Sequence, residues 1–324
     1  MQIYKFNSLL KPVLWGGDRL VKFLGLPPVA EPIGEVWELS AMPGRESVVA
    51  EGPEQGLTLT QLVQRHGADL VGEDVYRRYG DKFPLLIKLI DAQRDLSVQV
   101  HPDDDMARRH GGNGKNEMWY ILEGDHGAVI RTGFNRDLTV QEFDHLLADG
   151  KILDVINAMP SQRGQVYYIP AGQIHTIGAG NVLVEIQQSS DITYRVWDYN
   201  RRDAQGNLRQ LHIDEAREAL NFHAGNGHVT EFSHLGNGVT GLVKCQDFVV
   251  SRIDVADRCC LELPDQHSFV ALVCIDGKTA VQADGLQPAT LQRGETALLP
   301  AIAGRTEFIG TAQLLSATVP IHIR

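Results

Sequence analysis

The chain has 324 residues, of which 43% are hydrophobic and 22% are charged, proportions typical of a folded protein of about two domains. This composition argues against disordered, collagen-like and coiled-coil chains, and no apolar run reaches the ~18 residues that a membrane-spanning helix needs. The formal net charge of −11 argues against nucleic-acid binding, because an acidic chain does not bind phosphate backbones without a local basic patch.

Short strands dominate the predicted structure. They are rich in β-branched and aromatic residues, several alternate between apolar and polar positions, and Gly, Pro, Asp or Asn bounds them. In chain order, the predicted strands are 84–90, 96–100, 118–122, 166–170, 182–188, 193–199, 248–255, 269–275, 295–300 and 312–317.

Three segments show the apolar spacing of amphipathic helices, namely 57–72, 138–159 and 212–222. In the second of these, Thr139 and the glutamate three residues later form the pattern of a capping box. The acidic run that follows Pro102 is interpreted as a solvated turn. A strand-rich chain with three helical insertions predicts a mainly β protein rather than alternating βαβ units.

One sequence pattern occurs twice. Residues 163–171 and 293–301 both consist of Arg-Gly, five residues with a strand-like composition, and Pro-Ala. Each copy follows an apolar strand that ends in glycine, Gly124 in the first copy and Gly277 in the second. The first copy is longer by about the length of the helical segment 138–159. We infer two related β domains, of which the first carries a helical insertion.

The predicted boundary separates a larger domain, residues 1–238, from a smaller β domain, residues 239–324. The second copy of the repeat has Arg305 where the first copy has His175. We therefore expect metal chemistry in the first domain only.

Side chains that could bind a metal lie at three places in the first domain. Gln99 and His101 are two residues apart on a predicted strand, so they point to the same face. Glu117 lies on the strand that follows, and His175 comes after a later strand and a glycine turn. Two imidazoles, a carboxylate and an amide oxygen suit a divalent ion, most often Zn²⁺, at a catalytic site with an open position. Taken singly, each residue is more commonly an ordinary polar group of a strand, so the prediction depends on the spacing.

That spacing resembles the two sequence signatures of the cupin barrels. Residues 164–175 match the second signature, and residues 117–124 match the end of the first. Gln99-x-His101 replaces the usual His-x-His, and 15 residues rather than three or four separate His101 from the glutamate. These departures indicate a subfamily.

Four longer segments resemble the short bacterial type I mannose-6-phosphate isomerases: PLLIKLIDAQRDLSVQVHPDD, GKNEMWYILEG, YYIPAGQIHTIG and DITYRVWDYNR. The resemblance extends from Trp15 to about Arg202. It implies a mainly β fold of two cupin-like (jelly-roll) β-barrels with helical insertions. It also implies one Zn²⁺ per chain, held by Gln99, His101, Glu117 and His175.

The resemblance further implies a substrate pocket lined by Lys88, Lys115, Asp191 and Arg195. Lys115 lies two residues before Glu117, so the two would share one face of a strand. Asp191 and Arg195 are four residues apart and would share a face in the same way. Lys88 lies inside an apolar run, where a charged residue either faces outward or serves a site.

The implied reaction is the interconversion of mannose 6-phosphate and fructose 6-phosphate by zinc-assisted proton transfer. Lys115 is the predicted proton-transfer group, and Asp191 is the competing base. Arg195 is expected to bind the phosphate or the developing negative charge, and Lys88 is expected to contact the phosphate. Gly114 stands where some relatives have a histidine, so any ring-opening role of that histidine must come from another group or from water.

Two other functions remain open at this point. A cupin dioxygenase would use Fe²⁺ in the same fold, and a non-catalytic cupin would bind a phosphorylated sugar without turnover. The chain shows no signal-peptide pattern and no CxxC pair among its four cysteines, so we expect a cytoplasmic protein. The expected partner is a phosphorylated sugar, with no nucleic acid and no membrane, and the expected oligomeric state is a monomer or a homodimer.

Overall fold

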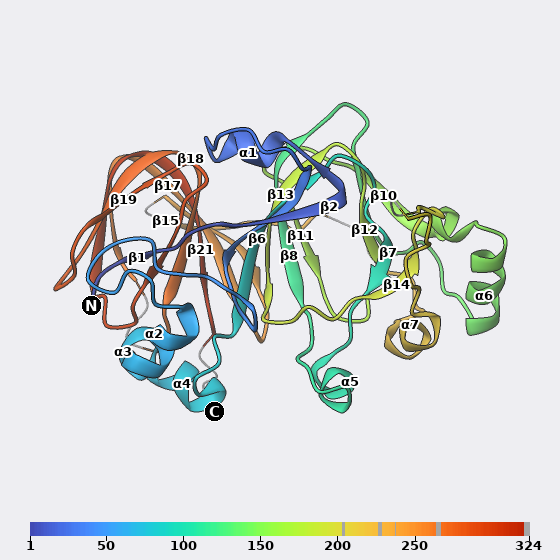
Figure 1. Ribbon diagram of the computed structural model, residues 1–324, viewed down its shortest axis with the longest axis horizontal. Helices are drawn as coiled ribbons and strands as arrows, with labels where there is room; N and C mark the ends of the chain where they lie inside the picture. Colours follow the sequence, from blue (N-terminus) through green and yellow to red (C-terminus); the bar gives the residue numbers. More distant parts are fainter. Residues whose placement is uncertain (203–204, 226–228, 237, 264–266, 321–324) are drawn as a thin grey trace.

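The computed structural model describes residues 1–202, 205–225, 229–236, 238–263 and 267–320. Strands dominate the described chain, and its three large sheets are arranged along the long axis of the molecule (Figure 1). A six-stranded sheet lies in the middle, with a five-stranded sheet on one side and an eight-stranded sheet on the other. The predicted mainly β class is therefore confirmed.

The six-stranded and five-stranded sheets carry the predicted site. The six-stranded sheet has the strand order β11-β8-β13-β6-β3-β2. Its strands are β2 (Leu9–Gly17), β3 (Ile33–Leu39), β6 (Leu85–Ala92), β8 (Glu117–Gly124), β11 (Val166–Ile169) and β13 (Asn181–Gln188). The five-stranded sheet has the order β10-β9-β12-β7-β14. Its strands are β7 (Val98–Val100), β9 (Val129–Phe134), β10 (Ile156–Pro160), β12 (His175–Ile177) and β14 (Tyr194–Trp197).

Both faces of the six-stranded sheet are buried. Ile87 on β6 and Val184 on β13 pack outward into a core shared with the eight-stranded sheet. Ile90 and Leu183, on the same two strands, belong to the core between the six-stranded and five-stranded sheets. Alternate residues of a strand share a face, so Lys88 points inward with Ile90. The same alternation turns charged side chains into the space between the two sheets.

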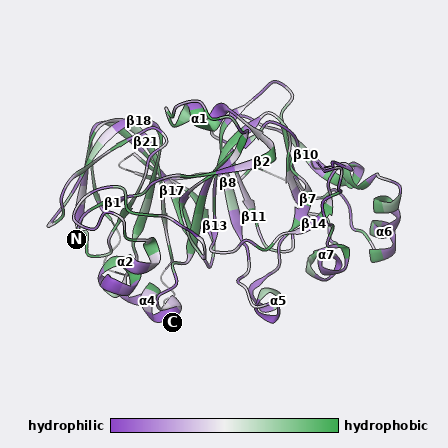
Figure 2. Cartoon of the chain, viewed as in Figure 1, coloured by the Kyte–Doolittle hydropathy of each residue, from purple (hydrophilic) through white to green (hydrophobic). Residues whose placement is uncertain are grey.

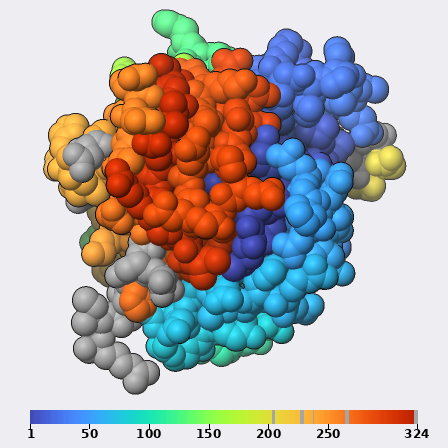
Figure 3. All heavy atoms as spheres, turned by 90° about the vertical axis from the view of Figure 1, so that its left-hand side faces the viewer, coloured from blue at the N-terminus to red at the C-terminus, as the bar shows by residue number. Residues whose placement is uncertain are grey.

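The eight-stranded sheet is built mainly from the C-terminal third of the chain. Its path is β1-β20-β18-β21-β17-β16-β15, and β19 pairs with β18. The strands are β1 (Tyr4–Lys5), β15 (Ser233–Gly236), β16 (Val239–Lys244), β17 (Val249–Glu262), β18 (Val270–Ala283), β19 (Ala289–Gln292), β20 (Thr296–Leu299) and β21 (Arg305–Thr318). The N-terminal β1 pairs with β20, and Figure 3 shows N-terminal residues, in blue, beside the orange and red C-terminal strands. The domain boundary at residue 238 stays a prediction.

Short helices and one small ribbon complete the described structure. The helices are α1 (Arg19–Phe23), α2 (Leu59–His66), α3 (Ala68–Val71), α4 (Glu73–Tyr79), α5 (Asp104–Arg109), α6 (Val140–Ala148), α7 (Ile213–Ala219) and the 3₁₀ segment Ile152–Val155. The two-stranded ribbon joins β4 (Ala41–Met42) to β5 (Arg45–Glu46). Figure 2 shows both hydrophobic and hydrophilic residues on α2 and α6, as expected of helices that cover a core. Within the described residues, none of these helices has the length and hydropathy needed to cross a bilayer.

Two of the helix predictions need correction in their extent. The segment 57–72 forms α2 and α3 rather than one helix, because Gly67 adopts a φ of 49° between them. The segment 138–159 forms α6 and the 3₁₀ segment Ile152–Val155 rather than one helix, and its last residues belong to β10, which begins at Ile156. The predicted start itself is confirmed, because Thr139 forms the capping box of α6.

The acidic run after Pro102 is a helix, not the solvated turn that we expected. Asp103 caps α5 by accepting a hydrogen bond from the backbone N–H of Met106 at 2.8 Å. Asp104 and Asp105 occupy the first turn, where negative charge favours the helix dipole. The acidic residues therefore start a helix, a signal that we did not recognise.

The internal repeat has the same hydrogen bonding in both copies. The backbone N–H of Gly164 donates to the carbonyl of Ile121 at 2.9 Å, and that of Gly294 donates to the carbonyl of Cys274 at 2.8 Å. Both glycines have a positive φ, 86° and 92°, which favours glycine. The acceptor in each copy, Ile121 or Cys274, lies three residues before the glycine that ends the preceding apolar strand, Gly124 or Gly277. The repeat therefore corresponds to one turn that is built twice.

Glu38 is a buried carboxyl group on β3 near the eight-stranded sheet. Its side chain accepts a hydrogen bond from Ser8 Oγ at 2.8 Å. Burial raises the pKa of Glu38 from 4.5 to about 8, and the nearby Glu295 carboxylate acts in the same direction. The folded chain therefore retains a proton that the unfolded chain loses at lower pH.

We expect Glu38→Gln to change how stability depends on pH. Between pH 4.5 and about 8, Glu38 makes the parent chain lose up to about 1.4 kcal/mol of unfolding free energy per pH unit. The glutamine variant lacks this contribution and should be more stable than the parent at pH 9. Urea unfolding at a series of pH values measures the difference. Parallel stability profiles for parent and variant would contradict the assignment.

Candidate metal centre and active site

The structure brings together three of the predicted metal ligands. His101 follows β7, Glu117 begins β8 and His175 begins β12. Nε2 of His101 lies 3.4 Å from one oxygen of Glu117, and Nε2 of His175 lies 3.3 Å from the other. All three potential ligand atoms lie within 4.8 Å of one another, and all three residues are buried.

The hydrogen bonds of the two imidazoles fix which nitrogen is available. Nδ1 of His101 lies 2.9 Å from the carbonyl oxygen of Ile192, and Nδ1 of His175 lies 2.8 Å from that of Gln173. Because a carbonyl can only accept, each Nδ1 carries the hydrogen and each Nε2 presents a lone pair to the cluster. Burial lowers the pKa of both rings, that of His175 to about 3. Both imidazoles are therefore neutral at pH 7, the form that binds metal.

Gln99 completes the predicted set. It pairs with His175 across β7 and β12, and its side-chain amide lies 3.3 Å from Nε2 of that histidine. Rotation about the last side-chain bond presents either the amide oxygen or the nitrogen at this place. The amide group is thus within reach of the same point as the two imidazoles.

The donor set fits a tetrahedral divalent ion. Ligands 2.0–2.2 Å from such an ion are about 3.3–3.6 Å apart, which matches the separations between Glu117 and the two histidines. One oxygen of Glu117 is buried without a hydrogen-bond partner among the described residues. An unsatisfied buried oxygen beside two imidazole lone pairs is what a metal site requires.

Lys115 lies directly against this cluster. Its Nζ is 2.9 Å from Nε2 of His101 and forms an ion pair with Glu117. Although burial alone would raise the pKa of Glu117, the Lys115 ammonium holds that pKa well below its usual range. The carboxyl group is therefore ionised at neutral pH.

A cavity of ≈ 290 Å³ opens beside the cluster. Five of the predicted site residues line it, namely Lys88, Gln99, Lys115, Asp191 and Arg195. Gln99 and Lys115 also touch the metal-ligand cluster. The cavity and the cluster thus form one site between the two sheets.

Lys88 is held rigidly in the wall of this cavity. Its ammonium donates to Glu185 at 3.0 Å and to Gln187 at 2.8 Å, and it lies 5.3 Å from the ring centre of Trp37. Although burial alone would lower the pKa of Lys88, Glu185 and Glu35 raise it above its usual value. Lys88 therefore stays charged and already has carboxylate and amide partners.

Asp191 and Arg195 differ in their surroundings. Asp191 is 45% exposed and forms an ion pair with Arg45 at 3.2 Å, which places it at the rim. Arg195 is half-buried, and its guanidinium donates to the carbonyl oxygen of Gln210 at 2.7 Å. Its Nε is buried and has no hydrogen-bond partner within the described part of the chain. Arg195 thus lines the cavity and has one donor that the described residues leave unsatisfied.

Four charged residues of the cavity were missed in the sequence: Lys11, Glu35, Glu185 and Arg209. Glu185 could have been predicted, because it lies on the inward-facing side of a predicted strand and pairs with Lys88 in the sheet register. Glu35 binds Lys11 at 3.0 Å, but both lie in strands that we did not predict. No local pattern marks Arg209.

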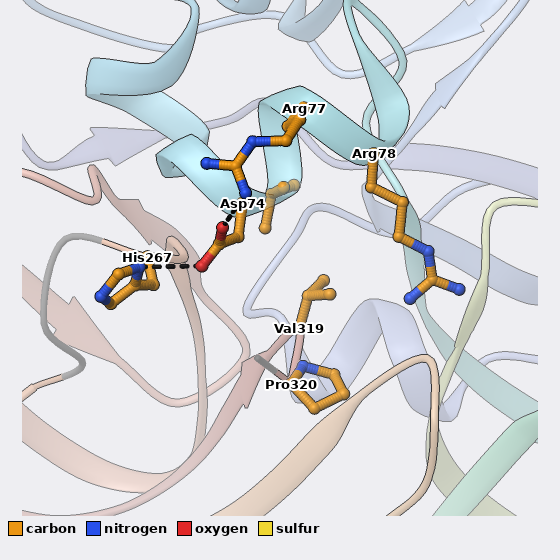
Figure 4. A pocket seen from close by; sticks show the side chains of 7 residues that line it. Asp74, Arg77, Arg78, His267, Val319 and Pro320 are labelled. Atoms are coloured by element: carbon orange, nitrogen blue, oxygen red, sulfur yellow. Dashed lines mark hydrogen bonds and ion pairs between the residues drawn. The ribbon is translucent and has the colours of Figure 1, made fainter. Parts of the chain in front are cut away.

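The pocket drawn in Figure 4 is a different feature. It lies between α4 and the C-terminal end of β21, has a volume of ≈ 350 Å³, and contains an ion pair between Asp74 and His267. Among the described residues, it shares none with the cavity beside Lys115. The predicted site residues all lie elsewhere.

Two family models and several known proteins are similar to this chain. The family model "Phosphomannose isomerase type I, catalytic domain" matches residues 3–128, and "Mannose-6-phosphate isomerase, cupin domain" matches residues 238–319. The mannose-6-phosphate isomerase of Streptococcus mutans is 34% identical over 313 residues, 96% of each chain. The mannose-6-phosphate isomerase ManA of Bacillus subtilis is 33% identical over 315 residues, again 96% of each chain.

A solved structure extends the similarity to the fold. The crystal structure of the mannose 6-phosphate isomerase from Bacillus subtilis superimposes with a TM-score of 0.87 at 31% identity, covering 98% of this chain and 99% of that one. The cupin fold and the family that the sequence motifs indicated are both confirmed. The chain therefore belongs to the type I phosphomannose isomerase family.

Proposed function

We propose that this chain interconverts mannose 6-phosphate and fructose 6-phosphate. The observation that carries the proposal is the buried cluster of His101, Glu117 and His175, with Lys115 connecting it to a charged cavity. This arrangement combines a place for a divalent ion with a group that can carry a proton. An aldose–ketose isomerisation needs both.

The charge of the cavity suits a phosphorylated sugar. Five cationic side chains and three carboxylates line it, although the whole chain carries a net charge of −11. Arg195 and Arg209 lie together in the wall, and the buried Nε of Arg195 lacks a partner among the described residues. A planar guanidinium binds phosphate through parallel hydrogen bonds. We assign Arg195, assisted by Arg209, to the phosphate or to the negative charge that develops on the sugar.

The residues that would hold one Zn²⁺ are Gln99, His101, Glu117 and His175. When bound there, the ion supplies a Lewis acid that stabilises negative charge on a substrate oxygen. The role of the protein is to keep both imidazoles neutral and oriented, and to keep Glu117 ionised. The backbone carbonyls of Ile192 and Gln173 provide the orientation.

The reaction moves a proton between two neighbouring carbons of the sugar. The proton lost from one carbon returns to the other, and a second proton moves from the hydroxyl oxygen to the neighbouring carbonyl oxygen, so the substrate neither gains nor loses electrons overall. Lys115 is our proposed carrier of this proton, because its side-chain nitrogen lines the cavity and touches the ligand cluster. As a neutral amine it would accept the proton from one carbon, and the ammonium so formed would return it to the other. Asp191 is the competing base, although its place at the rim and its ion pair with Arg45 suit an orienting role. Lys88 and Glu185 keep the opposite wall polar and fixed.

The enzyme is also proposed to act in the cytoplasm. All four cysteines lie in the described residues and all are free thiols, which suits a reducing compartment. Whether the chain is a monomer or a homodimer stays a prediction.

Removal of divalent metal should abolish the activity. We expect a coupled assay that detects fructose 6-phosphate to fall to background after dialysis against a chelator, and to recover when Zn²⁺ is added, because a substrate oxygen then regains its Lewis acid. Isomerase activity that persists in protein shown to be metal-free would contradict the proposal. A protein that binds the sugar phosphate without turnover would be a binding protein instead.

Substitution of Lys115 by methionine should separate catalysis from metal binding. The thioether keeps the length of the side chain but cannot carry a proton, so kcat should fall by roughly 10²–10⁴-fold. Zinc content, measured by elemental analysis, should stay near that of the parent. A variant that loses its zinc would show that Lys115 supports the site rather than moving the proton.

A further inference from the structure

Asn116 lies between Lys115 and Glu117, and its side chain connects the candidate site to the rest of the molecule. Its Nδ2 donates to Oδ2 of Asp247 at 2.8 Å. Its Oδ1 accepts from the backbone N–H of Ala171 at 2.8 Å. The two ends of one amide group thus hold two different parts of the chain.

Asp247 lies in the loop between β16 and β17, two strands of the eight-stranded sheet. It is 1% exposed, and its other oxygen lies 3.4 Å from Arg78. A buried carboxylate is costly unless hydrogen bonds satisfy it, and Asn116 provides one. Because a carboxylate accepts but cannot donate, Asp247 forces Asn116 to turn its nitrogen toward it. The oxygen of the amide then faces Ala171.

The contact with Ala171 reaches the loop that leads to His175. The next residue, Gly172, donates its backbone N–H to the carbonyl of His101 at 2.9 Å. On the other side, the backbone N–H of Asn116 donates to the side chain of Gln188 at 2.8 Å. The amide group of Asn116 therefore links the residue before Glu117 to the loop that precedes His175, and Gly172 of that loop contacts His101.

We propose that Asp247 is a positioning residue for the active site, supplied by the eight-stranded sheet. By fixing the amide of Asn116, it sets the place of Lys115 and Glu117 relative to His175. The proposal rests on the proposed function and makes the eight-stranded sheet a support for the catalytic site. Asp247 touches neither the substrate cavity nor the metal ligands, so its effect is indirect.

The test compares substitutions of Asp247 with a matched control. Asp247→Ala should lower kcat about tenfold and weaken Zn²⁺ affinity about tenfold, the range typical of residues that orient metal ligands, with a smaller change in KM. Asp247→Asn should retain more kcat and Zn²⁺ affinity than Asp247→Ala, since its amide oxygen accepts the hydrogen bond from Asn116 even though its nitrogen cannot accept from Arg78. The control is Asp276→Ala, which removes another contact between the sheets, the exposed ion pair to Arg163 at 3.0 Å. It should leave kcat and Zn²⁺ affinity unchanged.

An exchange of the two side chains makes the test independent of simple destabilisation. Asn116→Asp alone places two carboxylates against each other, so kcat and Zn²⁺ affinity should both fall severely. The double variant Asn116→Asp/Asp247→Asn restores a donor opposite an acceptor, and also restores the acceptor for Ala171. It should therefore recover much of the lost kcat and Zn²⁺ affinity.

Two results would overturn the proposal. One is a folded Asp247→Ala variant with the kcat and Zn²⁺ affinity of the parent. The other is a double variant whose kcat and Zn²⁺ affinity are no higher than those of Asn116→Asp alone. This result decides the question even if Asp247→Ala does not fold. If the parent does not isomerise mannose 6-phosphate, the proposed function fails. Zn²⁺ affinity, measured by competition with a chelator, then still decides the role of Asp247.

Discussion

The site depends on the buried carboxylate of Glu117. A buried negative charge is tolerated only beside compensating positive charge or hydrogen bonds, and Lys115 provides the ion pair in this structure. Two neutral imidazoles direct their lone pairs to the same place, held by the backbone carbonyls of Ile192 and Gln173. These groups offer an ionised carboxylate and two imidazole lone pairs, a donor set that suits a small divalent cation.

The three-sheet architecture makes this arrangement possible. Because both faces of the six-stranded sheet are covered, its outward side chains anchor it to the eight-stranded sheet, whereas its inward side chains are free to serve chemistry. Lys88, Glu117 and Glu185 all occupy inward positions. The outward contacts also reach the site, since Asp247 of the eight-stranded sheet binds the residue between Lys115 and Glu117. The six-stranded sheet therefore contributes both to the packing of the fold and to the candidate site.

The sequence predicted the metal-ligand cluster from one local spacing and from the resemblance of residues 117–124 and 164–175 to the cupin signatures. A two-residue spacing on a strand, as in Gln99 and His101, requires no knowledge of the rest of the fold. The repeat was also readable, because each copy is one compact turn with its glycine. Arg209 and the pairing of β1 with β20 were not predictable, since both depend on contacts between residues distant in the sequence. The helix α5 was missed for a different reason: its acidic first turn has the composition of a solvated loop.

The central claim is that Gln99, His101, Glu117 and His175 bind one zinc ion. X-ray absorption spectroscopy of the zinc-loaded protein at the zinc edge tests it most directly, since it reports the atoms around the metal. The account predicts only nitrogen and oxygen neighbours at about 2.0–2.2 Å, with imidazole scattering that diminishes in His175→Ala. A sulfur neighbour at about 2.3 Å would place the metal on a cysteine instead and contradict the account.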